Sequence, residues 1–113
     1  MVKQKVLWLD AVTSTNDAAW SLLEKNTHRA VAAHHQTAGR GRAGRTWSSP
    51  IHAGLYLSWI CHPSIAPEQG SVVPLAIAVA AAEVCDELGC PVRLKWPNDL
   101  LYNGKKIAGI LCE

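Results

Sequence analysis

Residues 36–47 carry the groups with the clearest chemical potential in this chain. They read QTAGRGRAGRTW, so three arginines and three glycines fall within residues 39–45 with no acid among them. Glycine lets backbone amides approach a ligand closely, and arginine binds carboxylate or phosphate through two parallel hydrogen bonds. Residues 39–47, called the arginine loop below, are therefore predicted to be a mobile cationic loop that binds an anion.

A solvated basic loop or a weak RNA contact would be the simpler interpretation of an RGR sequence taken alone. The formal net charge of the chain is only +2, which argues against a general nucleic-acid coat. Trp47 is the one aromatic residue of the loop that could stack on a base. The GK[ST] ending of a phosphate-binding P-loop is absent from the segment. Nucleic-acid binding is therefore not expected.

Two further groups could act on the same ligand. Lys95 precedes a Trp-Pro turn at the end of an expected strand, so its amine could neutralise charge developing at a carboxylate or phosphorus. Ser14, Thr15 and Asn16 can exchange hydrogen bonds with a neutral polar ligand. Taken singly, a surface lysine with a packed stem and an ordinary helix cap are the simpler interpretations.

Other reaction chemistries find little support in the sequence. No G-x-S-x-G segment surrounds a serine, no pair of acids suggests glycoside hydrolysis, and no histidine has metal-ligand spacing, so no metal site is predicted. The cysteines show no CxxC spacing and are expected to be buried, reduced thiols of a cytoplasmic protein: Cys61, Cys85, Cys90 and Cys112.

The elements that must position these residues alternate between strand and helix patterns. Strands are predicted at residues 5–9, 29–34, 54–60 and 90–95, followed by a hairpin with arms at 100–102 and 105–111. Asn103-Gly104 between the arms is typical of a type I′ turn. This mixture predicts an α+β fold.

Two helices complete the expected architecture. The first begins after a Ser14 cap and runs through about Lys25. The second covers residues 71–88, with Pro74 in its first turn and Gly89 after its end. Because it is apolar on nearly every side up to Ala82, it is expected to be buried.

Length and hydropathy limit the class of protein. The chain has 113 residues, of which 49% are hydrophobic, as expected for one small globular domain. Its longest apolar run, residues 72–82, is well short of the roughly 20 residues that span a bilayer. The N-terminus does not resemble a signal peptide, and a cytoplasmic protein is predicted. The chain ends at residues 110–113 within or just after a strand, so we expect a cut inside a domain.

Taken together and in order, five segments resemble the catalytic domain of biotin–protein ligases, the biotin–[acetyl-CoA-carboxylase] ligases of the biotin/lipoate ligase superfamily. The GRGRxGRxW and KWPND patterns are the specific parts, and Ala43 stands where many members carry another arginine. The five segments are STN at 14–16, QTAGRGRAGRTW at 36–47, GLYLS at 54–58, KWPNDL at 95–100 and KIAGIL at 106–111.

The resemblance implies a mixed sheet with flanking helices, related to class II aminoacyl-tRNA synthetases. Residues 1–113 would be the N-terminal part of the catalytic domain, truncated at its C-terminus, with no DNA-binding domain and no C-terminal barrel. The implied reaction joins biotin and ATP, with Mg²⁺, into biotinyl-5′-AMP and then passes biotin to a lysine of a biotin carboxyl carrier protein. No protein nucleophile is needed, because the biotin carboxylate itself attacks the α-phosphorus. Missing strands would expose sheet edges, with a homodimer as one consequence.

The resemblance also assigns roles to residues. Arg40, Arg42 and Lys95 would be the catalytic cations, since each unit-charge repulsion between carboxylate and phosphate costs about 4 kcal/mol at about 4 Å and an effective dielectric of about 20. The arginine loop is expected to be disordered when empty and to close over the ligand. Biotin would be bound by Ser14, Thr15, Asn16, Gln36, Arg40, Gly41, Arg42 and Lys95, and the nucleotide by Arg42, Arg45 and Trp47.

Two alternatives remain open from the residues alone. One is a lipoate or octanoyl ligase or transferase on a related fold. The other is a truncated fragment that binds biotin without catalysis.

Overall fold

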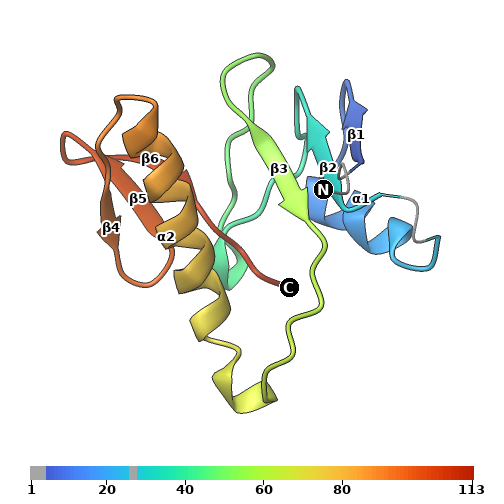
Figure 1. Ribbon diagram of the computed structural model, residues 1–113. Helices are drawn as coiled ribbons and strands as arrows, with labels where there is room; N and C mark the ends of the chain where they lie inside the picture. Colours follow the sequence, from blue (N-terminus) through green and yellow to red (C-terminus); the bar gives the residue numbers. More distant parts are fainter. Residues whose placement is uncertain (1–4, 26–27) are drawn as a thin grey trace. The chain divides into compact units, whose positions relative to one another are not determined.

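The computed structural model describes residues 5–25 and 28–113, which form two compact units, Met1–Pro63 and Ser64–Glu113 (Figure 1). Each unit contains one three-stranded sheet and one α-helix, so the predicted α+β class is confirmed. The first unit contains β1 (Val6–Leu9), α1 (Thr15–Leu22), β2 (Ala30–Ala33), the 3₁₀ turn η1 (Arg42–Gly44) and β3 (Tyr56–Trp59). The second contains the 3₁₀ turn η2 (Pro67–Gln69), α2 (Val72–Glu87), β4 (Arg93–Lys95), β5 (Asp99–Tyr102) and β6 (Lys105–Gly109).

The sheet of the first unit is mixed and has β2 at its centre. β1 runs parallel to β2, and β3 runs antiparallel to it. All four residues of β2 are small and buried, so α1 can pack closely against the sheet. In β3, Tyr56 and Ser58 are buried whereas Leu57 and Trp59 are exposed, which is the alternation expected of a strand with one covered face.

Helix α1 begins where the sequence predicts. Ser14 is extended (φ −156°), and its hydroxyl accepts a hydrogen bond from the Asp17 amide at 3.2 Å, so the predicted cap is confirmed. The helix ends at Leu22 rather than near Lys25. The Leu23 and Lys25 amides donate to the carbonyls three residues earlier, which tightens the chain into turns.

The second unit has an antiparallel sheet in the order β4-β5-β6. Asn103 (φ 50°) and Gly104 (φ 76°) both adopt positive φ, which confirms the type I′ turn between β5 and β6. Gly89 (φ 81°) follows the C-terminus of α2, also as predicted. β4 begins at Arg93 rather than at residue 90, because Pro91 has no amide hydrogen to donate to a neighbouring strand.

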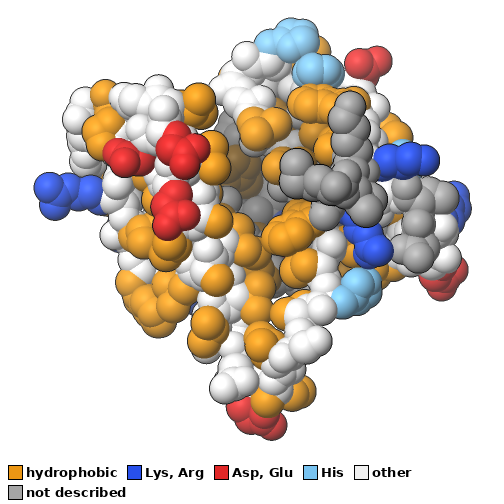
Figure 2. Space-filling view, in the orientation of Figure 1, with side chains coloured by type: hydrophobic (Ala, Val, Ile, Leu, Met, Phe, Trp, Pro, Cys, Tyr) orange, Lys and Arg blue, Asp and Glu red, His pale blue; other side chains and the backbone are white. Residues whose placement is uncertain are grey.

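The prediction that α2 is buried is wrong for the described chain. Ala78 is its one buried residue among those described, while Val72, Val79 and Val84 are each more than 40% exposed. A helix that is apolar all round needs neighbours on several sides, and among the described residues of its unit α2 packs mainly against β4 and β5. Figure 2 shows hydrophobic side chains and a group of acidic ones at the surface of this helix.

Two other predictions concern the cysteines and the membrane. The prediction that the cysteines are buried is wrong: Cys61 and Cys112 are exposed, and the other two are only half-buried. The two exposed cysteines lie in irregular segments after β3 and β6. No helix in the described ranges is long and apolar enough to cross a membrane.

Candidate functional site

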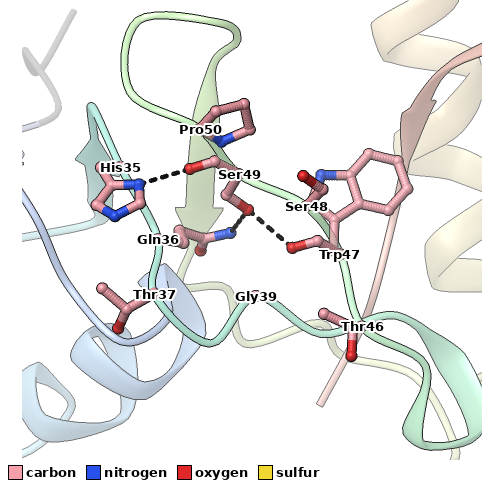
Figure 3. A pocket seen from close by; sticks show the side chains of 9 residues that line it. All are labelled: His35, Gln36, Thr37, Gly39, Thr46, Trp47, Ser48, Ser49 and Pro50. Atoms are coloured by element: carbon pink, nitrogen blue, oxygen red, sulfur yellow. Dashed lines mark hydrogen bonds between the residues drawn. The ribbon is translucent and has the colours of Figure 1, made fainter.

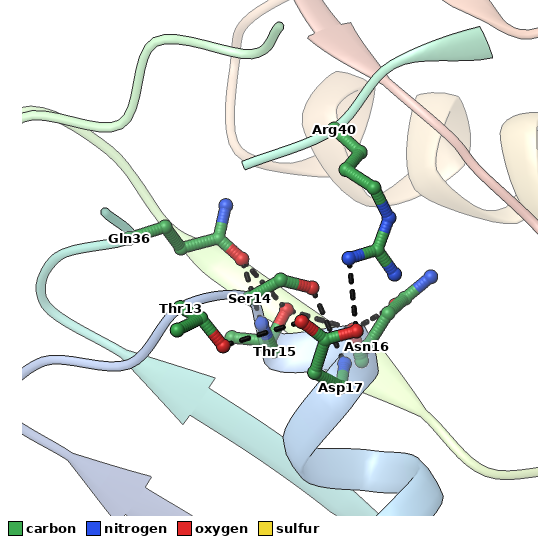
Figure 4. Close-up of polar contacts among 8 residues, drawn as sticks. Thr13, Ser14, Thr15, Asn16, Asp17, Gln36 and Arg40 are labelled. Atoms are coloured by element: carbon green, nitrogen blue, oxygen red, sulfur yellow. Dashed lines mark hydrogen bonds and ion pairs between the residues drawn. The ribbon is translucent and has the colours of Figure 1, made fainter. Parts of the chain in front are cut away.

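The start of α1 is joined by hydrogen bonds to the segment that follows β2 (Figure 4). The Thr15 amide donates to Gln36 Oε1 at 2.8 Å, and the Thr15 hydroxyl lies 3.2 Å from the same oxygen. Gln36 lies near the start of α1 because it forms an isolated parallel β-bridge with Val12. The amide of the next residue, Thr37, donates to the Val12 carbonyl at 2.9 Å. The structure therefore brings together Thr15 and Gln36, two residues predicted to bind biotin.

Ser58 on β3 completes this network, and sequence reasoning did not find it. Its hydroxyl donates a short hydrogen bond to Asn16 Oδ1 and lies 2.7 Å from Thr15 Oγ1. Either hydroxyl can be the donor in the hydrogen bond between Thr15 and Ser58. The usable signal was its alternation with Tyr56, which places a serine on the buried face of a strand.

Burial makes these hydrogen bonds obligatory. Ser14, Thr15 and Ser58 are only 3%, 4% and 7% exposed. A buried hydroxyl without a partner costs about 1–3 kcal/mol, so each of these groups must keep a defined partner. We therefore expect these side chains to be held in fixed positions.

The nitrogen of the Gln36 side-chain amide is also hydrogen-bonded within the protein. Gln36 Nε2 donates to Ser49 Oγ at 3.0 Å, and Ser49 in turn donates to the Trp47 carbonyl at 3.1 Å (Figure 3). His35 Nδ1 lies 2.7 Å from the Ser49 carbonyl. No G-x-S-x-G segment surrounds Ser49, and its hydroxyl instead joins the Gln36 amide to the Trp47 carbonyl.

The arginine loop has a defined hairpin-like conformation. The Trp47 amide donates to the Gly39 carbonyl at 2.8 Å, and Arg40 forms a bridge with Thr46. At the turn of the loop, Ala43 (φ 55°) and Gly44 (φ 72°) are left-handed. The expected disorder and closure of this loop remain predictions, since they concern its motion.

Two glycines of the loop have distinct constraints. A Cβ on Gly39 would lie 2.6 Å from the Trp47 carbonyl oxygen and 2.7 Å from Ser49 Oγ, so only glycine fits there. The Gly41 amide, expected to meet the ligand, instead donates to the Arg45 carbonyl at 2.7 Å. In this arrangement the Gly41 amide closes the turn.

Arg40 is held by an acid of the first unit. Its Nη1 lies 2.8 Å from Asp17 Oδ1, and the Thr13 hydroxyl donates to Asp17 Oδ2 at 3.2 Å (Figure 4). The two charged side chains are 35% and 47% exposed. Sequence reasoning missed this ion pair, because a contact between residues 23 positions apart leaves no local pattern.

The remaining loop residues differ in burial. Arg42, the first residue of η1, and Arg45, which follows η1, are exposed, whereas Trp47 is half-buried. Trp47 lines a pocket of about 400 Å³ together with His35, Gln36, Thr46, Ser49 and Pro50, among others (Figure 3). Within residues 5–25 and 28–113, no group of three or more His, Cys, Asp or Glu side chains is arranged to hold a metal ion.

Lys95 lies in the second unit, at the end of β4, with an exposed side chain. The turn after it is fixed by Asn98, whose Nδ2 donates to the Ile110 carbonyl at 2.8 Å and whose carbonyl accepts from the Ile110 amide at 2.9 Å. The structure thus groups the candidates of the first unit, and the meeting of Lys95 with them remains a prediction.

Comparison with known families identifies the class of protein. The model of the Biotin/lipoate A/B protein ligase family matches residues 8–113. Because that match covers almost the whole chain, the chain belongs to this family.

Within the family, the chain is similar to individual biotin ligases. The chain is 39% identical over 113 residues to the bifunctional ligase/repressor BirA of Bacillus subtilis, covering 97% of this chain and 35% of that protein. A biotin protein ligase from Aquifex aeolicus, solved with biotin and ATP, superposes with a TM-score of 0.81 at 38% identity, covering 96% of this chain and 46% of that one.

A second solved structure contains biotinyl-5-AMP. The biotin protein ligase of Leishmania major in complex with biotinyl-5-AMP superposes with a TM-score of 0.78 at 34% identity, covering 97% of this chain and 52% of that one. The chain therefore spans about a third to a half of the length of the relatives it matches. Both similarities confirm the predicted ligase fold.

Proposed function

We propose that the protein containing this chain is a biotin–protein ligase. It activates biotin with ATP to biotinyl-5′-AMP and transfers the biotinyl group to a lysine of a biotin carboxyl carrier protein. The observation that carries this proposal is the buried network of Thr15, Gln36 and Ser58, from which the arginine loop extends. Relatives that were solved with biotin, ATP and biotinyl-5-AMP support the same substrates.

The network suits a neutral, polar ligand. The ureido ring of biotin needs hydrogen-bond donors and acceptors, which hydroxyl and amide groups supply. Ser14, Thr15, Asn16 and Gln36 bring four such side chains to the start of α1. Neighbouring hydrogen bonds hold them in place before the ligand arrives, which lowers the entropic cost of binding.

The cations suit the reacting end of biotin. Arg40, Arg42 and Lys95 offset the repulsion between the biotin carboxylate and the α-phosphate, and the Gly41 amide adds a donor once the loop rearranges. Arg45 and Trp47 bind the nucleotide, Trp47 through the pocket that it lines. Mg²⁺ enters with ATP, because it keeps most of its water and prefers phosphate oxygens. Closure of the arginine loop then protects the adenylate from water.

The network also argues against the alternative substrate within the family. Lipoate and octanoate present an apolar end, which cannot exchange hydrogen bonds with the hydroxyl and amide groups of this network. A cytoplasmic location fits four free thiols, and a homodimer stays part of the proposal.

The decisive experiment measures pyrophosphate release by the purified protein with ATP and each acid. Release that requires biotin and does not occur with lipoate or octanoate is the expected result. Release with lipoate or octanoate in place of biotin would reassign the substrate. Saturable biotin binding without pyrophosphate release would identify a non-catalytic binding fragment.

A further inference from the structure

His34 and His52 bring two imidazole rings together at the surface of the first unit. Their ring centres lie 5.2 Å apart, with the ring planes tilted by 55°. His34 is half-buried and His52 is exposed, so small ions in solution can reach the pair. Within residues 5–25 and 28–113, neither ring takes part in a hydrogen bond or an ion pair, whereas His35 Nδ1 lies against the Ser49 carbonyl. The ring nitrogens of His34 and His52 are therefore available to a ligand.

The backbone holds the two histidines next to each other. The His52 amide donates to the His34 carbonyl at 3.2 Å, and the Gln36 amide donates to the Ser49 carbonyl at 3.2 Å. These bonds join the segment after β2 to the turn before β3. His52 has a left-handed φ of 56°, which is uncommon for a residue with a Cβ and which glycine would adopt more readily. A histidine kept at such a position indicates that its side chain has a role.

The separation of the two rings fits the coordination of one metal ion by both. A tetrahedral ion bound to a ring nitrogen at about 2.0–2.1 Å lies about 3.2 Å from the ring centre, so two such rings have centres about 5.2 Å apart. The rings of His34 and His52 already have this separation. Rotation about the bond from Cβ to the ring turns the nitrogens and leaves the ring centre almost in place. Both rings can therefore present a nitrogen to the same ion without a movement of the backbone.

We propose that His34 and His52 form a bidentate site for a divalent transition-metal ion that prefers imidazole ligands, of the class of Ni²⁺, Cu²⁺ and Zn²⁺. Water fills the other coordination positions, because no group of three or more His, Cys, Asp or Glu side chains meets in the described part of the chain. Two protein ligands make a weaker site than the four ligands of a structural zinc centre. The site goes beyond the proposed ligase function and does not depend on it.

Trp8 places the histidine pair on one face of the sheet and reports on it. The ring centres of Trp8 and His34 lie 5.6 Å apart in a stacked arrangement. Trp8 pairs with Ala32, which pairs with Leu57, so these side chains share a face of the sheet. Ser58, the next residue of β3, points to the other face, where it contacts the start of α1. An ion bound by the histidines is therefore close to the Trp8 indole and separate from the network around Ser58.

The first test titrates the tag-free protein with Ni²⁺ and follows tryptophan fluorescence, because bound Ni²⁺ quenches a neighbouring indole. Saturable quenching that an excess of Zn²⁺ reverses is the expected result. His34→Asn and His52→Asn should each weaken Ni²⁺ binding by at least about tenfold, since even the loss of an outer-shell partner typically costs that much. Asparagine tolerates the left-handed φ at position 52, so the turn is preserved.

Two further variants define where the ion binds. His62→Asn is the matched control, because His62 is another exposed histidine of the first unit, and it should bind Ni²⁺ as the wild type does. Trp8→Phe should keep the wild-type affinity, measured by calorimetry, and lose most of the quenching. Wild-type affinity in both His34→Asn and His52→Asn means that other groups bind the ion, and it overturns the proposal. Unchanged quenching in Trp8→Phe, or no saturable binding by the wild type, overturns it as well.

The second test measures thermal unfolding with and without Ni²⁺. An ion that binds the folded histidine pair stabilises the protein by mass action, so saturating Ni²⁺ should raise the wild-type Tm by several degrees, and EDTA should reverse the rise. His34→Asn and His52→Asn should show the wild-type Tm without the ion and little rise with it. An equal rise in the wild type and in both variants overturns the proposal, whatever the ligase activity of the protein.

Discussion

The predicted catalytic cations of the two units differ in whether an acidic side chain is paired with them. In the first unit, Asp17 holds Arg40 itself at 2.8 Å. In the second, Asp99 holds Lys106, and Lys95 is left without a charged partner among the described residues. Arg40 belongs to a glycine-rich loop, where a carboxylate helps to define the position of the guanidinium. Lys95 ends a paired strand, so its backbone is already placed and its charge can remain available.

Replacing the unpaired cation should have the largest effect. Lys95→Ala is expected to lower the kcat of biotin-dependent pyrophosphate release by about 100-fold, the loss typical of one electrostatic group that acts on the transition state. Biotin binding, measured by calorimetry, should change much less. Comparable losses in binding and rate would show that Lys95 acts as an ordinary ligand contact and would remove the contrast between the units.

A substitution at the base of the arginine loop should come next. Gly39→Ala places a Cβ 2.6 Å from the Trp47 carbonyl oxygen and 2.9 Å from Gln36 Nε2, so the backbone of the loop must shift. We expect a loss of about 1–3 kcal/mol in the free energy of unfolding, measured in urea, and weaker biotin binding. Gly104→Ala is a useful reference, since it has φ 76° but no atom within 4 Å of its Cβ, and it isolates the backbone cost from the clash. Equal destabilisation by both substitutions would contradict the close packing around Gly39.

The smallest expected effect comes from the acid that holds Arg40. Asp17→Asn keeps a hydrogen-bond acceptor but removes the charge, so we expect biotin to bind about two- to fivefold more weakly, with little change in Tm. The measurement is biotin affinity at low and at high salt, because the loss should shrink as salt screens the pair. Tighter binding in Asp17→Asn would mean that Asp17 competes with the ligand for Arg40 and would reverse our view of this pair.

Local signals predicted the elements well. The Ser14 cap, the Asn103-Gly104 turn and the glycine after α2 depend on neighbouring residues, and the structure confirms all three. The observed ends of the strands differ from the predicted ends by a few residues, where a proline lies in the segment or where pairing with the neighbouring strand stops. The resemblance also placed Thr15 and Gln36 in one site, where they contact each other.

Contacts between residues far apart in the chain could not be predicted from the sequence. The role of Ser58 and the pairing of Asp17 with Arg40 connect residues far apart in the chain and depend on strand register. The exposure of α2 likewise depends on which surfaces surround it, and its composition alone suggested full burial. A pattern of residue types reports what a segment can bury, whereas its actual neighbours decide what is buried.

The central strand of the first unit has one further consequence. β2 is bonded to β1 on one side and to β3 on the other, and its four side chains are buried, so local fraying cannot expose its amide hydrogens. Those amides should exchange with deuterium only when the first unit opens as a whole. Slower exchange of the β2 amides in the presence of biotin would show that biotin binds to the first unit. This measurement works even in a Lys95→Ala protein that no longer releases pyrophosphate.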